Sequence, residues 1–422
     1  SIRMKFAAAA CLAIVLSRPD ARCAGVSAFR QPLAPWSRLR GGSTQYPQQP
    51  QPQQQPPQQQ QQQGAASRPL VVVGSVNADI IIEVERLPTS GETLCTKDPS
   101  TGKVVPGGKG CNQAICAARL CRGPSRFVCQ FGGDAHAHML QRALAASGVD
   151  LSACGRAAHM PSGQGYVFLE PSGTVSSIVI GGSNAVWPRL SPEMCTQLVR
   201  GAGAVLLQRE VPEHVNEAVA AAARAAGVPV LQDAGGEDRP ITDAHLAQVN
   251  VIAPNLSELR RLSGMSTDTQ AEVLAAAASL RARGAAAVLV TLGSRGAMLL
   301  GPGDLQLFQP CAPLPGGKAV DETGAGDCFR VAFTAALVEG RPVKECLRFA
   351  AAAGALAASR MGAVPSIPSR GEVEALAAKT AEATEVAGVA LGADGAQQVE
   401  TAQGEGAAVG GGGEAAGGAG AA

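Results

Sequence analysis

Residues 321–329 read Asp-Glu-Thr-Gly-Ala-Gly-Asp-Cys-Phe, and an alanine-rich apolar run follows them as far as Val338. The glycines allow backbone N–H groups to converge, and the N-terminus of a helix adds partial positive charge at the same point. The pattern therefore predicts a loop that binds an anion such as phosphate and leads into a helix. Asp327 would then act as a base toward a hydroxyl that attacks the phosphate. A glycine loop in which the aspartate only caps the helix is the alternative.

The composition of the whole chain excludes several classes of protein. Of the 422 residues, 46% are hydrophobic, enough to bury the core of one large domain or two medium ones. The net charge is +1, and Lys and Arg form no long run, so nucleic-acid binding has no electrostatic support. The twelve cysteines contain no Cys-x-x-Cys pair and no histidine cluster accompanies them, which argues against zinc. We expect reduced, mostly buried thiols.

The N-terminal part of the sequence, residues 1–45, resembles a targeting presequence. Lys5 precedes an apolar run, Phe6–Leu16, that has the length of a signal peptide and is too short to span a bilayer. Residues 26–32, Val-Ser-Ala-Phe-Arg-Gln-Pro, resemble the Ala-Phe-x-Pro junction of bipartite presequences that direct proteins into complex plastids. We therefore expect a plastid location and no membrane segment in the mature form. Secretion and a cytoplasmic location are the alternatives.

Two further segments have compositions that do not favour a packed core. Residues 46–67 are dominated by Gln and Pro, which predicts a disordered linker. Residues 385–422 are rich in Gly, Ala and Glu and contain no aromatic residue, so a disordered tail is expected there. The folded domain is therefore predicted to span residues 68–384.

Strand and helix patterns alternate through the second half of this domain, which predicts a doubly wound α/β sheet. Its strands are expected at residues 204–208, 228–232, 251–253 and 287–291. Earlier β-branched runs fit that sheet less well and are interpreted as a small accessory layer. These runs are residues 80–84, 165–169 and 175–180.

Polar residues follow several predicted strands or lie in glycine turns. Asn77 and Asp79 come just after a strand, at the sheet edge where α/β proteins bind ligands, although both residue types also favour turns. Glu210 taken alone could be a solvated acid. Together, however, these side chains offer the hydrogen-bonding groups that a polyhydroxyl ligand requires. The set consists of Asp79, Lys109, Asn112, Glu210 and Asp327. No P-loop sequence and no complete dinucleotide-binding glycine motif is present.

Two longer motifs resemble those of the ribokinase/PfkB family of carbohydrate kinases. Residues 107–114 read Gly-Gly-Lys-Gly-Cys-Asn-Gln-Ala, and residues 321–329 form the second motif. Shorter matches occur in family order between Val71 and Ser369. The Asn-Ala-Asp, Gly-Gly-Lys-Gly and Pro-Ser-x-Pro segments are more similar to those of ribokinases than to those of fructokinases or adenosine kinases. Residues 233–236, Asp-Ala-Gly-Gly, resemble the plant type, which agrees with a plastid address.

The resemblance implies a ribokinase-like doubly wound sheet sandwiched by helices, with the early strands forming a β-sheet lid that also pairs two subunits into a homodimer. It implies ATP-dependent phosphorylation of D-ribose at O5, with Mg²⁺ and a K⁺ activator. Asp327 is then the base, and the amides of Gly324, Ala325 and Gly326 form the anion hole. The alternatives are another sugar or nucleoside kinase, such as a deoxyribokinase or fructokinase, and a catalytically silent plastid interaction protein.

The resemblance also implies binding residues, position by position. The sugar site would use Asn77, Asp79, Gly107, Gly108, Lys109, Asn112, Glu210 and Asp327. The ATP site would use Asp233, Thr291, Leu292, Gly293, Ser294, Arg295, Gly296 and Gly326. Mg²⁺ would be organised by Asn255 and Glu258, and K⁺ would lie near Asp321, Thr323, Ala357, Arg360, Gly362 and Ser366. Because Asp233 stands where bacterial ribokinases have an Asn that contacts ATP, an extra negative charge is expected near the phosphates.

Overall fold

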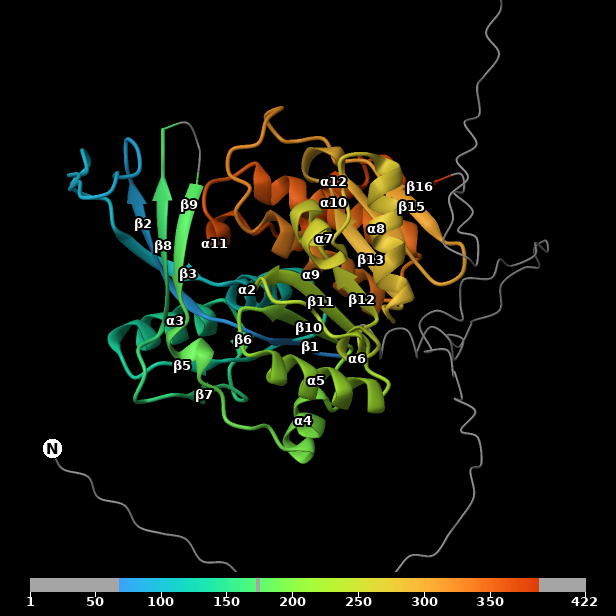
Figure 1. The fold of residues 1–422 in the computed structure, drawn as a ribbon, viewed down its shortest axis with the longest axis horizontal. Coiled ribbons are helices and arrows are strands. Elements are labelled where there is room, and N and C mark those ends of the chain that lie inside the picture. Colours follow the sequence, from blue (N-terminus) through green and yellow to red (C-terminus); the bar gives the residue numbers. More distant parts are fainter. Residues whose placement is uncertain (1–67, 172–174, 387–422) are drawn as a thin grey trace, which may run out of the picture. The chain divides into compact units, whose positions relative to one another are not determined.

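The main element of the protein is a ten-stranded sheet, seen in a computed structural model that describes residues 68–171 and 175–386 (Figure 1). In their order across the sheet the strands are β16 (Thr384–Glu385), β15 (Gln306–Gln309), β14 (Ala297–Leu300), β13 (Ala287–Thr291), β12 (Val251–Ala253), β11 (Val230–Gly236), β10 (Ala204–Arg209), β1 (Leu70–Val73), β4 (Ser125–Val128) and β6 (Val149–Asp150). Strands β13 through β6 in this order pair in parallel. Strands β14, β15 and β16 continue the sheet antiparallel.

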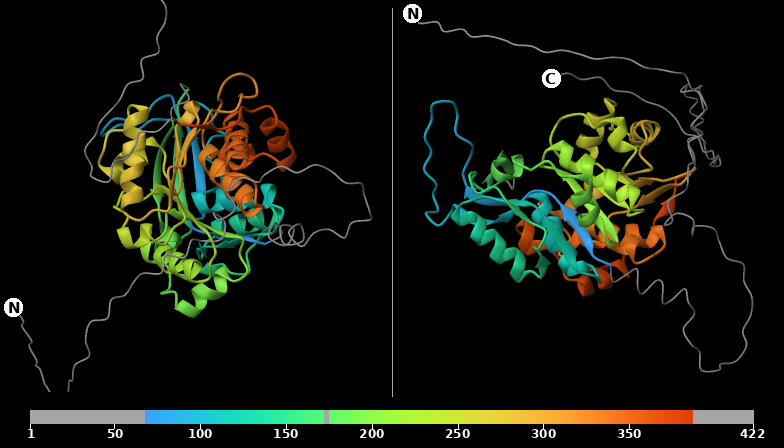
Figure 2. Two further views of the ribbon diagram at one scale, coloured as in Figure 1. Left: turned by 90° about the vertical axis from the view of Figure 1, so that its right-hand side faces the viewer. Right: turned by 90° about the horizontal axis from the view of Figure 1, so that it is seen from below.

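Helices cover both faces of this sheet. They are α2 (Lys109–Leu120), α3 (Ala135–Ala146), α4 (Pro192–Val199), α5 (Glu213–Ala225), α6 (Asp243–Leu246), α7 (Leu256–Ser263), α8 (Gln270–Ala282), α9 (Ala325–Val338), α10 (Val343–Ala358), α11 (Ala363–Ser366) and α12 (Arg370–Ala377). Val71 and Val205 pack in one core with residues of α4 through α8. Helices α2, α9 and α10 lie on the other side, as Figure 2 shows for α8 and α10. Burial on both faces explains why the central strands β1 and β12 are continuous apolar runs.

A separate four-stranded sheet stands beside the main sheet (Figure 1). Its order is β3 (Lys103–Gly107), β2 (Asn77–Glu83), β8 (Gly163–Leu169) and β9 (Val175–Ile180). Strands β2 and β8 pair in parallel, and the other two pairings are antiparallel. This sheet, called the lid below, confirms the predicted accessory layer. A two-stranded pair joins β5 (Gln130–Phe131) to β7 (Gly155–Arg156) below it.

The lid corrects one reading of the sequence. Asn77 and Asp79 do not form a turn; they are the first and third residues of β2. Strand β3 was not predicted, because Pro106 within a five-residue run weakens the strand pattern. Strand β9 lies at an edge of the lid, and its Ile178 and Val179 are more than half exposed, at 60% and 57%.

The α/β class and the central sheet agree with the prediction, although β1 and β4 from the first part of the chain also belong to that sheet. The predicted boundary at residue 384 falls inside β16, because Glu385 pairs with Leu307. Residues 1–45, 46–67 and 387–422 lie outside the described part of the chain. Within that part, no helix has the length and apolar character needed to cross a membrane.

Candidate active site

The glycine loop and helix predicted at residues 321–338 are both present. Gly324 is the N-cap of α9, and its φ of 77° is a left-handed conformation that glycine adopts without strain. Gly324, Ala325 and Gly326 line a cavity of about 360 Å³, and Asp327 lies in the first turn of the helix, at its wall. Asp327 does not cap the helix. Its carboxylate instead faces α2, so the capping interpretation is wrong.

Two amide side chains of α2 hold the Asp327 carboxylate, which is only 5% exposed. Nδ2 of Asn112 donates to Oδ2 at 3.1 Å, and Nε2 of Gln113 donates to Oδ1 at 2.9 Å. Burial raises the pKa of Asp327 above its ordinary value, and the positive charge of Lys109 opposes that rise. A raised pKa brings a carboxylate closer to the range suited to a general base. Oδ1 of Asn112 is buried and has no partner, so it can accept a hydrogen bond from a ligand hydroxyl.

The Asp79 carboxylate lies between two glycines of neighbouring lid strands. A Cβ added to Gly107 would lie 1.8 Å from Oδ2 of Asp79, and one added to Gly165 would lie 2.4 Å from Oδ1. Only glycine at both positions leaves room for this carboxylate. Burial, together with the nearby charge of Glu210, raises the pKa of Asp79 to about 7. Glu210 accepts from Oγ of Ser75 at 2.6 Å and from the Lys109 amide at 2.9 Å, and burial raises its pKa as well.

Asn77 belongs to a second network at the base of the lid. Nδ2 of Asn184 donates to Oδ1 of Asn77 at 2.7 Å and to the Val76 carbonyl at 3.1 Å. Gly163 leaves room for this pair, because an added Cβ would lie 2.1 Å from Nδ2 of Asn184. Gly108 has a positive φ of 87° and is the N-cap of α2, which places Lys109 at the first position of that helix.

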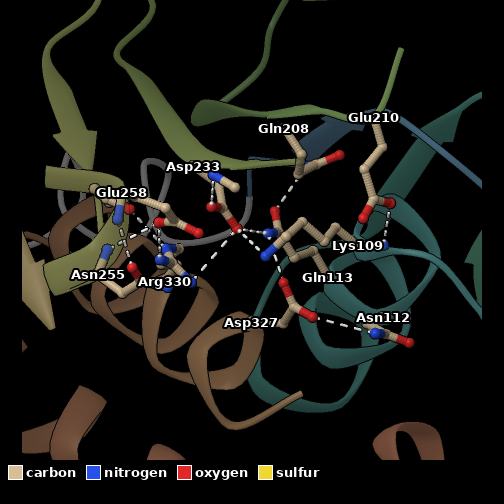
Figure 3. A network of polar contacts seen from close by, with 12 residues as sticks. Lys109, Asn112, Gln113, Gln208, Glu210, Asp233, Asn255, Glu258, Asp327 and Arg330 are labelled. Atoms are coloured by element: carbon tan, nitrogen blue, oxygen red, sulfur yellow. Dashed lines mark hydrogen bonds and ion pairs between the residues drawn. The ribbon is translucent and has the colours of Figure 1, made fainter. Parts of the chain in front are cut away.

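A chain of alternating charges connects the two motifs with the middle of the sheet (Figure 3). Nζ of Lys109 lies 3.3 Å from Oδ2 of Asp233, and Nη1 of Arg330 lies 3.4 Å from the same oxygen. Nη2 of Arg330 lies 3.6 Å from Oε2 of Glu258. Burial alone would raise the pKa of Asp233, but Arg330 and Lys109 lower it on balance. The charge of the buried Asp233 carboxylate is therefore balanced by two cations.

Gln113 connects this cluster with the base. Its Nε2 donates to Oδ2 of Asp233 at 3.1 Å as well as to Asp327, and its Oε1 accepts from Nε2 of Gln208 at 2.7 Å. Four residues of these networks were not predicted from the sequence: Gln113, Gln208, Asn184 and Arg330. Gln113 lies inside the quoted first motif, which was the available signal. Gln208 lies in a predicted strand and Arg330 in a predicted helix, and neither position gave a sequence signal for a role in the site.

The cavity extends from the Asp327 loop toward the predicted nucleotide residues. Thr291, Gly293, Ser294 and Gly296 line it, and its opposite wall is formed by small residues of α10. These wall residues are Ala351, Gly354, Ala355 and Ala358. Three predicted nucleotide residues do not line it. Leu292 packs in the hydrophobic core, Arg295 is exposed, and Asp233 is buried among its ion pairs.

Asn255 and Glu258 lie at the N-terminus of α7, where they form a capping box. The Asn255 amide donates to Oε2 of Glu258 at 2.8 Å, and the Glu258 amide donates to Oδ1 of Asn255 at 2.9 Å. Asn255 lines the cavity. In the described part of the chain, no group of three or more His, Cys, Asp or Glu could hold a metal. This donor set fits Mg²⁺, which keeps several waters and uses one or two carboxylates together with substrate phosphates.

The predicted cation residues gather where the loop before α9 meets α10 and α11. Oδ1 of Asp321 accepts from the Thr323 amide at 2.9 Å, and Oδ2 accepts from the Gly362 amide at 2.7 Å. Ser366 is buried and donates through Oγ to the Ala363 carbonyl at 2.8 Å. The remaining two predicted residues, Ala357 and Arg360, lie at and just beyond the end of α10. The α-carbon of Ala363 lies 3.3 Å from a Cβ added to Gly324, so this region contacts the glycine loop.

Comparisons with known proteins show which family the chain resembles. The profile of the pfkB family carbohydrate kinases matches residues 67–370. A ribokinase of Arabidopsis thaliana is 45% identical over 312 residues, which cover 73% of this chain and 81% of that protein. The structure of Arabidopsis thaliana ribokinase complexed with ribose and ATP superposes with a TM-score of 0.69 at 44% identity and covers 74% of this chain and 99% of that one. A ribokinase structure from Thermotoga maritima has a TM-score of 0.63 at 31% identity and covers 73% and 99%.

Proposed function

The chain belongs to the pfkB family of carbohydrate kinases, and we propose on that basis that it is a ribokinase, which transfers the γ-phosphoryl group of ATP to O5 of D-ribose. One observation supports this most strongly. The buried Asp327 carboxylate is held by Asn112 and Gln113 beside the Gly324–Gly326 loop, at the wall of a cavity that extends to the predicted nucleotide loop. A base and an anion hole are therefore adjacent, which is the arrangement that phosphoryl transfer to a hydroxyl requires.

The reaction follows from this geometry. Asp327 takes the proton from O5 as that oxygen forms its bond to the γ-phosphorus, and the bond to the β–γ bridging oxygen breaks to release ADP. The amides of the Gly324–Gly326 loop and the N-terminus of α9 stabilise the charge on the transferring group. Asp79, Glu210 and Oδ1 of Asn112 accept hydrogen bonds from sugar hydroxyls, which fixes the orientation of O5. The lid excludes water from the sugar.

We assign the cations by the fit of the donors. Mg²⁺ would be organised by Asn255 and Glu258 and would neutralise the phosphates of ATP. K⁺ would lie near Asp321, whose carboxylate already orders the backbone at Thr323 and Gly362. By this proposal K⁺ stabilises the loop that carries the anion hole, so it acts on turnover and not on the proton transfer itself.

Two further parts of the proposal concern the whole protein. The exposed Ile178, Val179 and Ile180 at the edge strand β9 support a homodimer in which two lids pair. The presequence-like residues 1–45 support a plastid location, with the cytoplasm as the alternative. Sedimentation of the chain from residue 68 onward tests the first, and the fluorescence of a fusion to residues 1–67 tests the second.

The kinase activity is tested by measuring ADP formation by the chain with D-ribose, 2-deoxy-D-ribose and D-fructose. We expect D-ribose to give the highest kcat/KM, because the site offers more acceptors than a deoxy sugar can satisfy, and unpaired buried acceptors are costly. A higher kcat/KM for 2-deoxy-D-ribose or D-fructose would reassign the substrate within the same family. No stimulation of ADP formation by any sugar would refute the proposal.

A further inference from the structure

Arg330 is a buried arginine with no role in the mechanism described so far. It follows Asp327 by three residues on α9, so both side chains project from the same side of the helix. The side chain is only 3% exposed, and Nε donates to the Ala253 carbonyl at the end of β12, at 3.0 Å. This bond fixes the plane of the guanidinium group against the sheet.

The guanidinium group of Arg330 lies beside the Gly324–Gly326 loop at the cavity wall. A Cβ added to Gly326 would lie 2.7 Å from Nη1, so the guanidinium group lies directly against the glycine loop. Arg330 lines the cavity together with Lys109 and Asp327. Among the described residues, the only hydrogen bond of the Arg330 side chain is the one made by Nε. Its other N–H groups therefore have donor capacity left for a ligand.

The ion pairs of Arg330 allow two interpretations of its role, which are neutralisation of buried carboxylates and contact with a ligand. It lies 3.4 Å from Asp233 and 3.6 Å from Glu258, so it could serve only to neutralise these buried carboxylates. Asp233, however, also accepts hydrogen bonds from Gln113 at 3.1 Å and from the Gly235 amide at 2.8 Å, and it pairs with Lys109. The hydrogen-bond acceptors of Asp233 thus have partners without Arg330, although the charge of Arg330 helps to neutralise Asp233, and the two Arg330 contacts are longer than direct hydrogen bonds. Their effect is to hold the cation in place.

We propose that Arg330 is a further catalytic residue, which donates hydrogen bonds from Nη1 to a non-bridging oxygen of the transferring phosphoryl group. The proposal rests on the ribokinase function proposed above. Proton and phosphoryl movements are unchanged, and Arg330 adds a fixed positive charge where negative charge spreads over the phosphoryl oxygens. Asp233 and Glu258 become positioning residues, which hold the guanidinium group in place before ATP arrives.

The test is a double-mutant cycle with Arg330→Gln, Asp233→Asn and the combined variant. Arg330→Gln alone could reduce stability, because one partner of a buried pair is lost. The combined variant removes both charges, so it restores the balance and is expected to fold. If Arg330 contacts the phosphoryl group, kcat of the combined variant lies about 10²- to 10³-fold below that of Asp233→Asn, with little change in KM for ribose. Equal kcat values for these two variants would overturn the proposal, because Arg330 would then only neutralise Asp233.

Two further measurements make the outcome specific. Calorimetry of ADP with aluminium fluoride and D-ribose should show weaker binding to the combined variant than to Asp233→Asn, while binding of ADP alone is equal in both.

Arg370→Gln is the matched control, because Arg370 is also a mostly buried arginine in ion pairs, with Glu339 and Glu374, and lies outside the cavity. We expect it to keep the wild-type kcat. Wild-type protein without ribose-dependent ADP formation would refute the ribokinase function itself, whereas an active wild type with no loss in the cycle would refute only the role of Arg330.

Discussion

The affinity of the protein for its sugar should depend on pH through Asp79. Burial and the neighbouring charge of Glu210 raise the pKa of this carboxyl to about 7. A carboxylate accepts hydrogen bonds from two hydroxyls, whereas the protonated form loses part of that capacity. If the sugar binds only the ionised form, its apparent affinity is reduced by the fraction of Asp79 that is protonated. For a pKa of about 7, the dissociation constant rises about tenfold between about pH 8 and about pH 6.

The assay is titration calorimetry of D-ribose with the protein in the absence of nucleotide. At about pH 7 roughly half of Asp79 is protonated, so binding should release about half a proton, measured from the dependence of the heat on the ionisation enthalpy of the buffer. The raised pKa of Asp79 also makes the stability of the protein without sugar depend on pH. Because it is raised above its unfolded value, the contribution of Asp79 to stability is present below about pH 4 and is lost as the pH rises through about 7.

Two variants separate Asp79 from its neighbours. Asp79→Asn should bind D-ribose weakly and without the roughly tenfold change in the dissociation constant between about pH 8 and about pH 6. Glu210→Gln removes the neighbouring charge that raises the pKa of Asp79, so the remaining pH dependence should move to lower pH. A dissociation constant that is unchanged from about pH 6 to about pH 8 in the wild type would refute the reasoning. So would a dependence of the same size in Asp79→Asn.

Three other outcomes follow from the site. Asp327→Asn should reduce kcat by at least about 10²-fold while calorimetry still detects D-ribose binding, because the base is lost and the sugar-binding acceptors remain; near-wild-type turnover would refute the base assignment. Replacing K⁺ by a large organic cation should lower kcat, and a flat response in the same coupled assay would contradict the cation region at Asp321. Gly165→Ala should raise KM for ribose by about tenfold or more, since the new Cβ would lie 2.4 Å from the Asp79 carboxylate. Gly371→Ala is the control and should leave KM unchanged, because an added Cβ there has no atom within 4 Å. Equal KM values for the two variants would show that Asp79 can move without cost.

The fold and the central motif could be predicted because their signals are local. The glycines before Asp327 and the apolar run after it are adjacent in the sequence, so loop, helix and carboxylate are encoded together. The partners of that carboxylate are not. Gln113 and Asp327 are 214 positions apart, and only the folded sheet brings them to 2.9 Å. Arg330 was missed for another reason. It lies inside a mostly apolar helix, and no periodicity reveals that its buried guanidinium group lines a cavity.

The same limit applies to the charge at Asp233. Asp233 lies in a buried ion-pair cluster and not at the cavity wall, and its effect depends on cations from α2 and α9 that no local pattern connects with it. The lid was recognisable as a layer from its alternating strands. Its role in the sugar site depends on Gly107 and Gly165, which meet at Asp79 only through the strand register.

The position of Asp79 on the lid separates two properties that are often encoded together. Asp79, one of the proposed sugar-binding residues, belongs to β2, whereas the proposed base and anion hole belong to the first turn of α9, far along the chain. If Asp79 has the proposed role, substitutions in the lid strands are expected to change the accepted sugar more than phosphoryl transfer. Chimeras that graft foreign lid strands onto this core would show whether the two properties can be exchanged independently.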